Sequence, residues 1–316
     1  MIDLVVGVDG GGSKTRVILA DAEGNHLADV TGGGSAMAPG RADHCADVIG
    51  ELVRQAVQTA EVGERLKVLV AGVAGVGREP EARALTVALE DLELADEVVV
   101  QGDGEIALTD AFGNGPGVML IAGTGSIAYG RGPSRVLARC GGWGPAFGDE
   151  GSGAWIGRKS LGIVASAADG REPQTALTGA ILTAAQVNEV TELVPWGIAA
   201  TPKELAALAP VVFNVASAGD PRAIALVGLA VEELVLHIRA LAVKLFGDDR
   251  AAVPVAFSGG LLHKGSFLRK KLEQRLKSAV PGAQVRPVEI IAARGAVKEA
   301  LSRIATTSSR ATTATT

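Results

Sequence analysis

Short apolar runs that end in glycine turns alternate with amphipathic segments along most of this chain. Residues 66–73 are almost continuously apolar, which is typical of a strand covered on both faces. Val48, Leu52 and Ala56 recur at helical spacing, so the stretch around them predicts a helix with one apolar face. By the same reasoning, we expect strands in the first part of the chain over residues 5–8, 16–20, 26–30, 66–73 and 97–100, and helices over 41–60, 79–90 and 103–111.

The pattern restarts after a glycine-rich break at residues 113–116. An apolar strand over 117–122 runs into a second glycine and hydroxyl turn, and a returning strand follows. The remainder predicts strands over 127–131, 136–140, 253–257 and 284–288, a mostly helical region over 175–246, and helices over 154–168, 264–278 and 292–304. We therefore expect an α/β protein with an N-terminal domain over 1–114, a C-terminal domain with a helical insertion over 115–305, and a disordered tail over 306–316.

Both halves open with the same device, a strand that runs into a glycine turn and returns as a second strand. The first turn follows Asp9 and reads Gly10-Gly11-Gly12-Ser13-Lys14, and the second spans 123–126. Ser13 separates the glycines from Lys14 and a strand follows, so neither the P-loop pattern nor the dinucleotide-binding pattern is met. Glycines at such a reversal let backbone N–H groups approach a phosphate closely. A hairpin turn without a ligand is the alternative for either stretch alone, and their repetition favours the phosphate interpretation.

Charge and composition exclude several classes of function. The net charge is −5 and the Lys and Arg residues are dispersed, which argues against nucleic acid as the main partner. The most apolar segment, 223–246, is interrupted by charged residues, so we expect a buried helix and no membrane span. Cys45 and Cys140 show no metal-binding spacing and no signal peptide precedes the first strand, so we expect reduced thiols in a cytoplasmic protein.

The two glycine turns belong to a set of six short stretches: Asp9–Thr15, Asp103–Ala107, Ala122–Ser126, Cys140–Gly144, Gly148–Ser152 and Ser258–Gly260. Together they resemble the actin-like (ribonuclease H-like) ATPase and sugar kinase fold. Within it the chain is similar to the N-acetylglucosamine kinase family, in the branch that also contains the ATPase activators of benzoyl-CoA reductase and 2-hydroxyacyl-CoA dehydratase. The resemblance implies two actin-like domains with ATP and Mg²⁺ in the cleft between them.

The resemblance also implies which residues hold the nucleotide. The two hairpins would hold the phosphates, and the late turn over 258–260 would lie by the adenosine. Asp9 would act on Mg²⁺ through water, since magnesium keeps several waters and needs few carboxylates. Lys14 could reach a phosphate, although its place in the returning strand suits a solvated lysine equally. The expected nucleotide-binding residues are Asp9, Gly11, Gly12, Ser13, Lys14, Gly123, Thr124, Gly125, Ser258, Gly259 and Gly260.

On the acceptor side, Asp103 matches the family's catalytic carboxylate, which would act as the base toward a sugar hydroxyl. Capping of the following helix is the alternative, and the two roles need not exclude each other. Trp143 could line one side of the sugar pocket or simply pack at the domain junction. The family often has Asn where this chain has Ala36 and Ile127, so recognition of an N-acetyl group stays open. The expected sugar-contacting residues are Ser35, Ala36, Asp103, Ser126, Ile127, Gly142, Trp143, Gly144 and Asp149.

These features predict an ATP-dependent kinase that phosphorylates the 6-hydroxyl of an amino sugar, N-acetylglucosamine first, with glucosamine or N-acetylmuramic acid as alternatives. A second class of function is an ATPase activator of a partner enzyme, which would need iron–sulfur cysteines at a dimer interface. A third is a sugar-sensing regulator, against which the lack of a helix-turn-helix extension weighs. We expect a homodimer with a small-molecule sugar as substrate.

Overall fold

The computed structural model describes residues 3–63, 66–248 and 251–313, with side chains up to residue 305. The chain forms two compact units, each built on one five-stranded sheet. Unit 1 comprises Met1–Gly115 and Ile290–Thr316, and unit 2 comprises Pro116–Glu289. The expected α/β class with two sheet domains is therefore confirmed.

Unit 1 contains the expected order of three strands followed by alternating helices and strands. Its sheet has the strand order β3-β2-β1-β4-β5, in which the first three strands pair antiparallel and β4 and β5 continue parallel to β1. Its elements are β1 (Leu4–Gly10), β2 (Thr15–Asp21), β3 (His26–Gly32), α1 (Ala42–Ala60), β4 (Leu66–Val73), α2 (Glu79–Glu90), β5 (Ala95–Gly102), α3 (Asp103–Phe112) and α11 (Ala292–Thr313).

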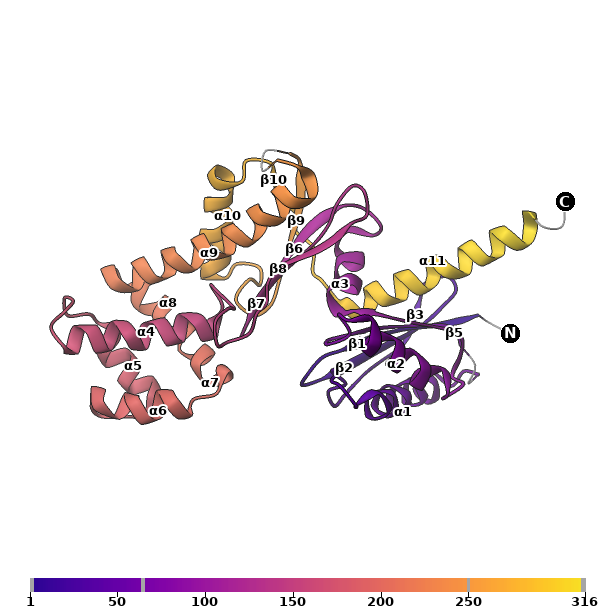
Figure 1. Cartoon of the computed structure of the whole chain (residues 1–316), viewed down its shortest axis with the longest axis horizontal. Helices are drawn as coiled ribbons and strands as arrows, with labels where there is room; N and C mark the ends of the chain where they lie inside the picture. Colours follow the sequence, from indigo (N-terminus) through magenta and orange to yellow (C-terminus); the bar gives the residue numbers. More distant parts are fainter. Residues whose placement is uncertain (1–2, 64–65, 249–250, 314–316) are drawn as a thin grey trace. The chain divides into compact units, whose positions relative to one another are not determined.

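Hydrophobic clusters cover both faces of this sheet. On one face Val6 packs in a cluster with Ile49 of α1. On the other face Val5 packs with Ile106 of α3 and Ala296 of α11. Figure 1 shows α11, in yellow, along the face opposite α1. Adjacent residues of β1 thus point into different clusters, as expected for a strand with apolar residues at every position.

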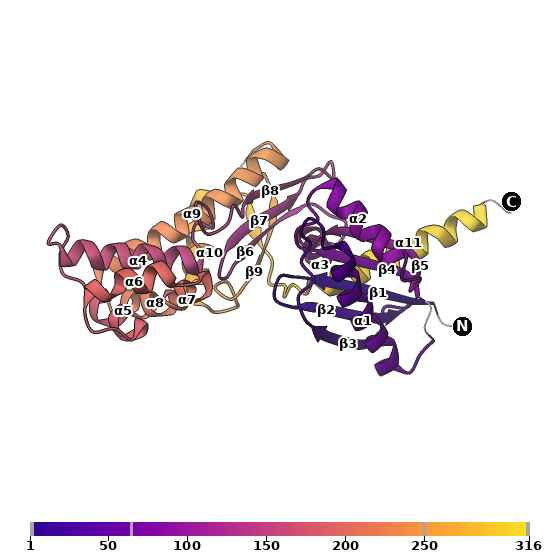
Figure 2. The same ribbon diagram turned by 60° about the horizontal axis from the view of Figure 1, so that its bottom comes forward.

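Unit 2 repeats the sheet of unit 1 and adds a helical insertion. Its strand order β8-β7-β6-β9-β10 matches β3-β2-β1-β4-β5, and every neighbouring pair runs in the same relative direction. Between β8 and β9 the chain forms helices, of which α4 to α8 gather at one end of the unit (Figure 2). The elements are β6 (Gly117–Ala122), β7 (Ser126–Arg131), β8 (Leu137–Gly141), α4 (Gly153–Ala168), α5 (Leu177–Ala185), η1 (Val190–Glu192), α6 (Leu193–Ala199), α7 (Pro202–Ala207), α8 (Ala209–Ser217), α9 (Pro221–Phe246), β9 (Val253–Ser258), α10 (Phe267–Ala279) and β10 (Ala283–Val285).

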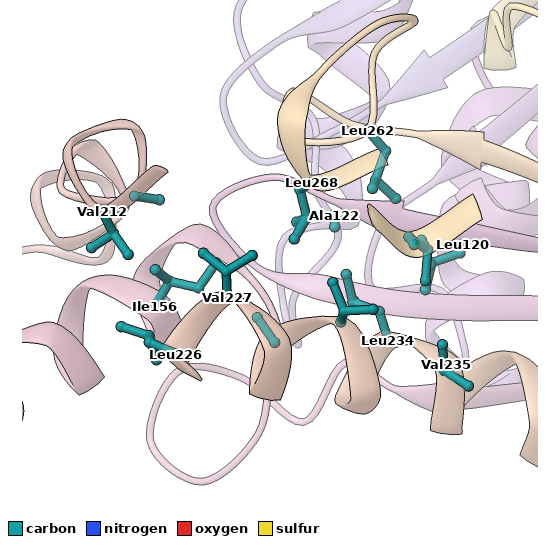
Figure 3. Close-up of a cluster of buried hydrophobic side chains, with 14 of the residues drawn as sticks. Leu120, Ala122, Ile156, Val212, Leu226, Val227, Leu234, Val235, Leu262 and Leu268 are labelled. Atoms are coloured by element: carbon teal, nitrogen blue, oxygen red, sulfur yellow. The ribbon is translucent and has the colours of Figure 1, made fainter. Parts of the chain in front are cut away.

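The core of unit 2 lies between its sheet and the long helix α9. Leu120 of β6 belongs to one cluster with Leu234 of α9 and Leu268 of α10 (Figure 3). Helix α9 includes the apolar segment that the sequence predicts to be a buried helix, and Asp220 caps it by accepting from the N–H of Ala223 at 2.9 Å. Over residues 3–63, 66–248 and 251–313, no helix is both long and apolar enough to cross a membrane.

The last helix differs from the expected domain division. It packs in unit 1 against α3 and β1, whereas the domain division expected from the sequence places residues 292–304 in the C-terminal domain. Gly295 makes this possible, because a Cβ there would lie 1.8 Å from the backbone oxygen of Ile106. The helix also continues to Thr313, where the composition predicts a disordered tail, since extending an existing helix costs little. Residues 314–316 of that tail lie outside the described residues.

Two boundaries in the late part of the chain also differ from the predicted ones. Helix α10 begins at Phe267 and not at residue 264, because Ser266 caps it by accepting from the N–H of Arg269 at 3.3 Å. Strand β10 ends at Val285 and not at residue 288. Neither difference moves a residue of the expected sites.

Candidate active site

The first glycine turn, between β1 and β2, is tight and open to solvent. The N–H of Gly11 donates to the carbonyl of Lys14 at 2.9 Å, which closes the turn. Gly12, Ser13 and Lys14 are exposed, and a Cβ built on Gly12 would meet no atom within 4 Å. A glycine turn with free space above it suits a phosphate group.

The carboxylates of Asp9 and Asp103 stand at the carboxyl ends of β1 and β5, and the charge of Asp103 acts on Asp9. Asp9 is the next-to-last residue of β1, and Asp103 is the first residue of α3, directly after β5. Burial raises the pKa of Asp9, and the negative charge of Asp103 raises it further, while Lys14 and Arg16 partly oppose this. A partly buried carboxylate pair beside an open turn is a suitable place for a divalent cation and for proton transfer.

Helix α3 begins at Asp103, and Gly102 takes the capping position. The N–H of Gly102 donates to Oε1 of Glu105 at 3.4 Å. Oδ1 of Asp103 accepts from the N–H of its neighbour Gly104 at 2.8 Å, and Oδ2 has no hydrogen-bond partner within the described part of the chain. The alternative in which Asp103 is the N-cap residue is therefore wrong, and one carboxylate oxygen stays available for chemistry.

The acceptor loop, residues 32–37 after β3, is bonded directly to the first glycine turn. The N–H groups of Ser35 and Ala36 both donate to the carbonyl of Gly11, at 3.0 and 3.1 Å. Ser35 is 1% exposed, and its Oγ accepts from Oγ1 of Thr15 at 2.8 Å. In this structure the Ser35 side chain bonds the loop to the start of β2, and its contact with a sugar stays a prediction.

The second glycine turn, between β6 and β7, is held by two other segments of unit 2. The N–H groups of Gly153 and Ala154, at the start of α4, donate to the carbonyls of Gly123 and Thr124 at 2.8 and 3.1 Å. The late turn over 258–260 lies alongside, since a Cβ on Gly123 would sit 3.7 Å from its last backbone nitrogen. The structure thus brings the second expected phosphate turn and the expected adenosine turn together.

Asp149 occupies a strained position beside this second turn. Its φ of 58° is left-handed, a region that residues other than glycine adopt rarely and that recurs at functional sites. Its Oδ2 lies 2.7 Å from where a Cβ of Gly125 would be, so the glycine leaves room for the carboxylate. The hydroxyl of Ser126 donates to the carbonyl of Glu150 at 2.7 Å, and the N–H of Gly142 donates to the carbonyl of Ser126 at 3.0 Å. Three of the expected sugar-contacting residues therefore lie together here.

Trp143 projects from the loop that precedes Asp149. The residue is 61% exposed, and the guanidinium carbon of Arg139 lies 4.4 Å from the centroid of its ring. Nη1 of Arg139 also donates to the carbonyl of Gly141 at 2.8 Å, which fixes the guanidinium. The sequence contains no signal for Arg139, because nothing in the strand pattern distinguishes it from a solvated arginine. Ile127 lies against the same loop, with Cδ1 2.4 Å from where a Cβ of Gly142 would be.

The predicted residues fall into two groups. Unit 1 holds Asp9, Asp103, the first turn and the acceptor loop, and unit 2 holds the second turn, the segment over 142–149 and the late turn. Their meeting in one cleft stays a prediction. Among residues whose side chains are described, no group of three or more Asp, Glu, His or Cys could hold a metal ion. Asp9, whose pKa the nearby Asp103 raises, offers the few carboxylate oxygens that Mg²⁺ takes beside its water and phosphate ligands.

Comparisons with known proteins extend over both units. A family model described as the BadF/BadG/BcrA/BcrD ATPase family matches residues 6–300. The N-acetylmuramic acid/N-acetylglucosamine kinase of Clostridium acetobutylicum is 29% identical over 298 residues, which cover 93% of this chain and 96% of that protein. The N-acetyl-D-glucosamine kinase of Dictyostelium discoideum is 30% identical over 300 residues, which cover 90% and 93%. The solved structure of a candidate N-acetylglucosamine kinase from Chromobacterium violaceum is 30% identical, with a TM-score of 0.74, over 95% of this chain and 99% of that chain. The resemblance and the fold predicted from the six stretches are confirmed.

Proposed function

This chain belongs to the BadF/BadG/BcrA/BcrD ATPase family, and from this premise we propose that it is an ATP-dependent amino-sugar kinase. Its reaction transfers the γ-phosphoryl group of ATP to the 6-hydroxyl of the sugar, with N-acetylglucosamine as the first candidate acceptor. The names of the Clostridium and Dictyostelium relatives support the substrate class, because both matches span nearly the whole chain.

The observation that carries the proposal is the arrangement at the end of β1. There the Asp9–Asp103 pair lies in the same unit as an open glycine turn, and the acceptor loop is bonded to that turn through Ser35 and Ala36. Phosphoryl transfer to a hydroxyl needs a base, charge neutralisation and a phosphate cradle. We assign the base to Asp103, whose Oδ2 is unpartnered within the described residues.

We assign nucleotide binding to the two glycine turns and to the late turn over 258–260. Asp9 would hold Mg²⁺ through water. The exposed Lys14 stands close enough to oppose part of the rise in the pKa of Asp9. The bound cation would supply charge neutralisation of the transferred group. Gly12 leaves the space that a phosphate needs, because a side chain there would project into it.

We assign acceptor binding to Asp149, Ser126 and the segment over 142–144, together with the acceptor loop. Ala36 and Ile127 put apolar groups where an amide would bond an N-acetyl group, so glucosamine and N-acetylmuramic acid stay as alternative acceptors. Trp143, with Arg139 on its ring, offers an exposed aromatic face to a sugar.

An ADP-release assay across a panel of sugars tests the proposal. The panel contains N-acetylglucosamine, glucosamine, N-acetylmuramic acid, N-acetylmannosamine and glucose, and phosphorus NMR of the product identifies the phosphorylated hydroxyl. We expect ADP release to depend on an amino sugar and the phosphate to be on the 6-position. ADP release that does not depend on any sugar would contradict the proposal and favour the ATPase alternative.

The ATPase-activator alternative is weakened by the state of the two cysteines. Cys45 is buried and its Sγ donates to the carbonyl of Ala36 at 3.4 Å. Burial raises the pKa of the Cys45 thiol, and burial together with the charge of Glu150 raises that of Cys140. To ligate an iron–sulfur cluster at a dimer interface, Cys45 would have to leave this buried contact with Ala36.

We also propose a homodimer in the cytoplasm, and sedimentation velocity tests the first part. A single species with the mass of one chain, at micromolar concentration, would contradict it. The result leaves the kinase assignment unchanged, because each chain carries both groups of predicted residues.

A further inference from the structure

His237 stands apart from the other histidines of the chain. It is 5% exposed, whereas His26, His44 and His263 are exposed. It lies on α9 three residues after Leu234, which belongs to the core cluster under the sheet of unit 2 (Figure 3). A buried imidazole on an apolar helix face needs polar partners.

The carbonyl of Glu233 sets the orientation of the ring. Nδ1 lies 2.7 Å from this oxygen, and because a carbonyl only accepts, Nδ1 carries the hydrogen. Nε2 is buried without a hydrogen-bond partner in the described part of the chain, and it lies 4.0 Å from Oε2 of Glu150. An approach of about 1 Å would join an imidazolium and this carboxylate by a charge-assisted hydrogen bond.

The same ring supports the backbone that leads to Asp149. A Cβ on Gly141 would lie 2.1 Å from Nε2, so the end of β8 passes directly over the imidazole. Glu150 follows Asp149 in the chain; its carbonyl accepts from Ser126 at 2.7 Å and its carboxylate faces His237. The residue after Asp149 is thus bonded to the hairpin through its carbonyl, and its carboxylate faces α9.

We propose that His237 is a positioning residue for Asp149 and acts through Glu150. In this proposal the pair closes from its 4.0 Å separation to a hydrogen bond and so holds the turn over 149–152, in which Asp149 has the left-handed φ that places its carboxylate beside Gly125. A residue other than glycine keeps a left-handed φ where surrounding contacts determine its conformation, and the closed pair would add such a contact. The inference rests on the proposed function, in which Asp149 contacts the acceptor sugar.

Two substitutions test the roles of the two ring nitrogens separately. In His237→Asn the amide can replace Nδ1 and nothing reaches Glu150, whereas in His237→Gln the amide reaches toward the place of Nε2. We expect His237→Asn to raise the acceptor KM about tenfold with the ATP KM unchanged, because a displaced binding group loses its orientation. His237→Gln brings the acceptor KM back to within about twofold of wild type, because an N–H again faces the carboxylate. A purely structural histidine would instead lower the melting temperature in both variants and shift both KM values together.

A double-mutant cycle with Glu150→Gln tests the coupling directly. If the pair acts as a unit, the double variant His237→Asn/Glu150→Gln has an acceptor KM within about twofold of the worse single variant. The inference would be overturned if the rise in acceptor KM of the double variant equalled the product of the two single-variant rises. An unchanged acceptor KM in His237→Asn would overturn it as well. His26→Gln, at an exposed position of β3, is the matched control and keeps wild-type kinetics.

Histidine-selective nitrogen NMR gives a readout that does not depend on activity. The Nε2 resonance of His237 shifts in Glu150→Gln and stays in place in His26→Gln. An unmoved resonance would overturn the pairing even if the enzyme is active. If no sugar in the panel is phosphorylated by the wild-type protein but the resonance shifts, the proposed function fails while the His237–Glu150 pair stands.

Discussion

The two units have sheets of the same topology but differ in where they carry charged residues. The two hairpins can be aligned on their last residue pairs, Gly10–Thr15 in unit 1 and Ala122–Ser126 in unit 2. In this alignment Asp9 of β1 corresponds to the apolar Ile121 of β6. The helix after the fifth strand begins with Asp103 in unit 1, whereas the corresponding helix α11 begins with Ala292. Lys14 follows the first glycine turn, and the second turn contains no charged residue.

This difference separates what the topology supplies from what the side chains add. In both units the sheet presents a glycine turn at the same strand end. The second turn is held by main-chain bonds from the start of α4, which suits binding through the backbone. The first turn has the Asp9–Asp103 pair beside it, which suits cation binding and proton transfer. Beside the second turn the carboxylate is that of Asp149, which the loop before α4 supplies. Shared architecture therefore permits two binding turns, and the Asp9–Asp103 pair beside the first defines where the chemistry would occur.

The largest effect should come from the acid that has no counterpart in unit 2. Asp103→Asn keeps the shape of the side chain and removes the base, so we expect kcat to fall about 10³-fold with little change in ATP KM. Glu105→Gln, two residues along the same helix, is the matched control and keeps activity within about threefold. Sugar-dependent ADP release measures both. Turnover of Asp103→Asn near that of wild type would remove the chemical asymmetry between the units.

A second test concerns the helix that unit 1 receives from the end of the chain. Asp110 of α3 is fully buried and accepts from Arg294 and Lys298 of α11, each at 2.7 Å. We expect Asp110→Ala to lower the free energy of unfolding by about 3 kcal/mol, because Arg294 and Lys298 lose the buried carboxylate that they contact. Chemical denaturation measures this loss. A change below about 0.5 kcal/mol would show that packing alone attaches α11.

The same carboxylate predicts a pH dependence. Burial pushes the pKa of Asp110 up, but hydrogen bonds from Arg294, Lys298 and the N–H of Ile291 outweigh burial and lower it. A lowered folded-state pKa gives stability that is present above the ordinary Asp pKa of about 3.9 and is lost as the pH falls through the folded-state value. Wild type should therefore lose more stability than Asp110→Asn on acidification below about pH 4. Equal losses of stability in wild type and Asp110→Asn on this acidification would contradict this.

The two glycine turns should respond differently to a methyl group. A Cβ on Gly12 meets free space, so Gly12→Ala should fold normally while its methyl obstructs a phosphate and raises the ATP KM about tenfold. A Cβ on Gly125 would lie 2.7 Å from Oδ2 of Asp149, so Gly125→Ala should displace the carboxylate and raise the acceptor KM. Steady-state kinetics with each substrate varied separates the two effects. Equal effects on both KM values in both variants would mean that the turns are not specialised.

The smallest expected effect is on stability and concerns Asp9. Its raised pKa means that the folded state binds this proton more tightly than the unfolded chain, so stability declines as the pH rises through the window above the ordinary Asp value. Asp9→Asn should therefore raise the melting temperature at pH 7 by about 1–3 °C, apart from its loss of activity, and the gain should shrink near pH 4. Ile121→Asn at the corresponding position of unit 2 should lower it. Thermal unfolding at both pH values decides, and a lower melting temperature for Asp9→Asn at pH 7 would contradict the sign.

Much of the fold could be predicted because its signals are local. Strands that end in glycine turns, such as the one before Gly123, can be recognised from alternation and turn residues alone. The position of α11 could not, because its apolar spacing suits packing on either sheet. Contacts between residues far apart in sequence decide which sheet it covers, such as the close approach of Gly295 to α3 and the bonds from Arg294 and Lys298 to Asp110.

The site divides in the same way. Asp9, Asp103 and Asp149 could be identified because they stand beside glycines in short stretches with a family resemblance. His237 and Arg139 could not, since their partners are distant in sequence or lie in irregular loops. Helical spacing from Leu234 does place His237 on the buried face, which is the one signal that singles it out before its partner is known.

The attachment of α11 to unit 1 also fixes the order in which the molecule can mature during synthesis. The face of the first sheet that carries Val5 needs Ala296 of α11 to close its hydrophobic cluster, and residues 116–289 must be translated in between. At 5–20 residues per second this takes roughly ten to thirty seconds, during which that face lacks α11. A nascent chain stalled before residue 290 would therefore expose an apolar sheet face, and we expect this protein to depend most on chaperones while residues 116–289 are being translated.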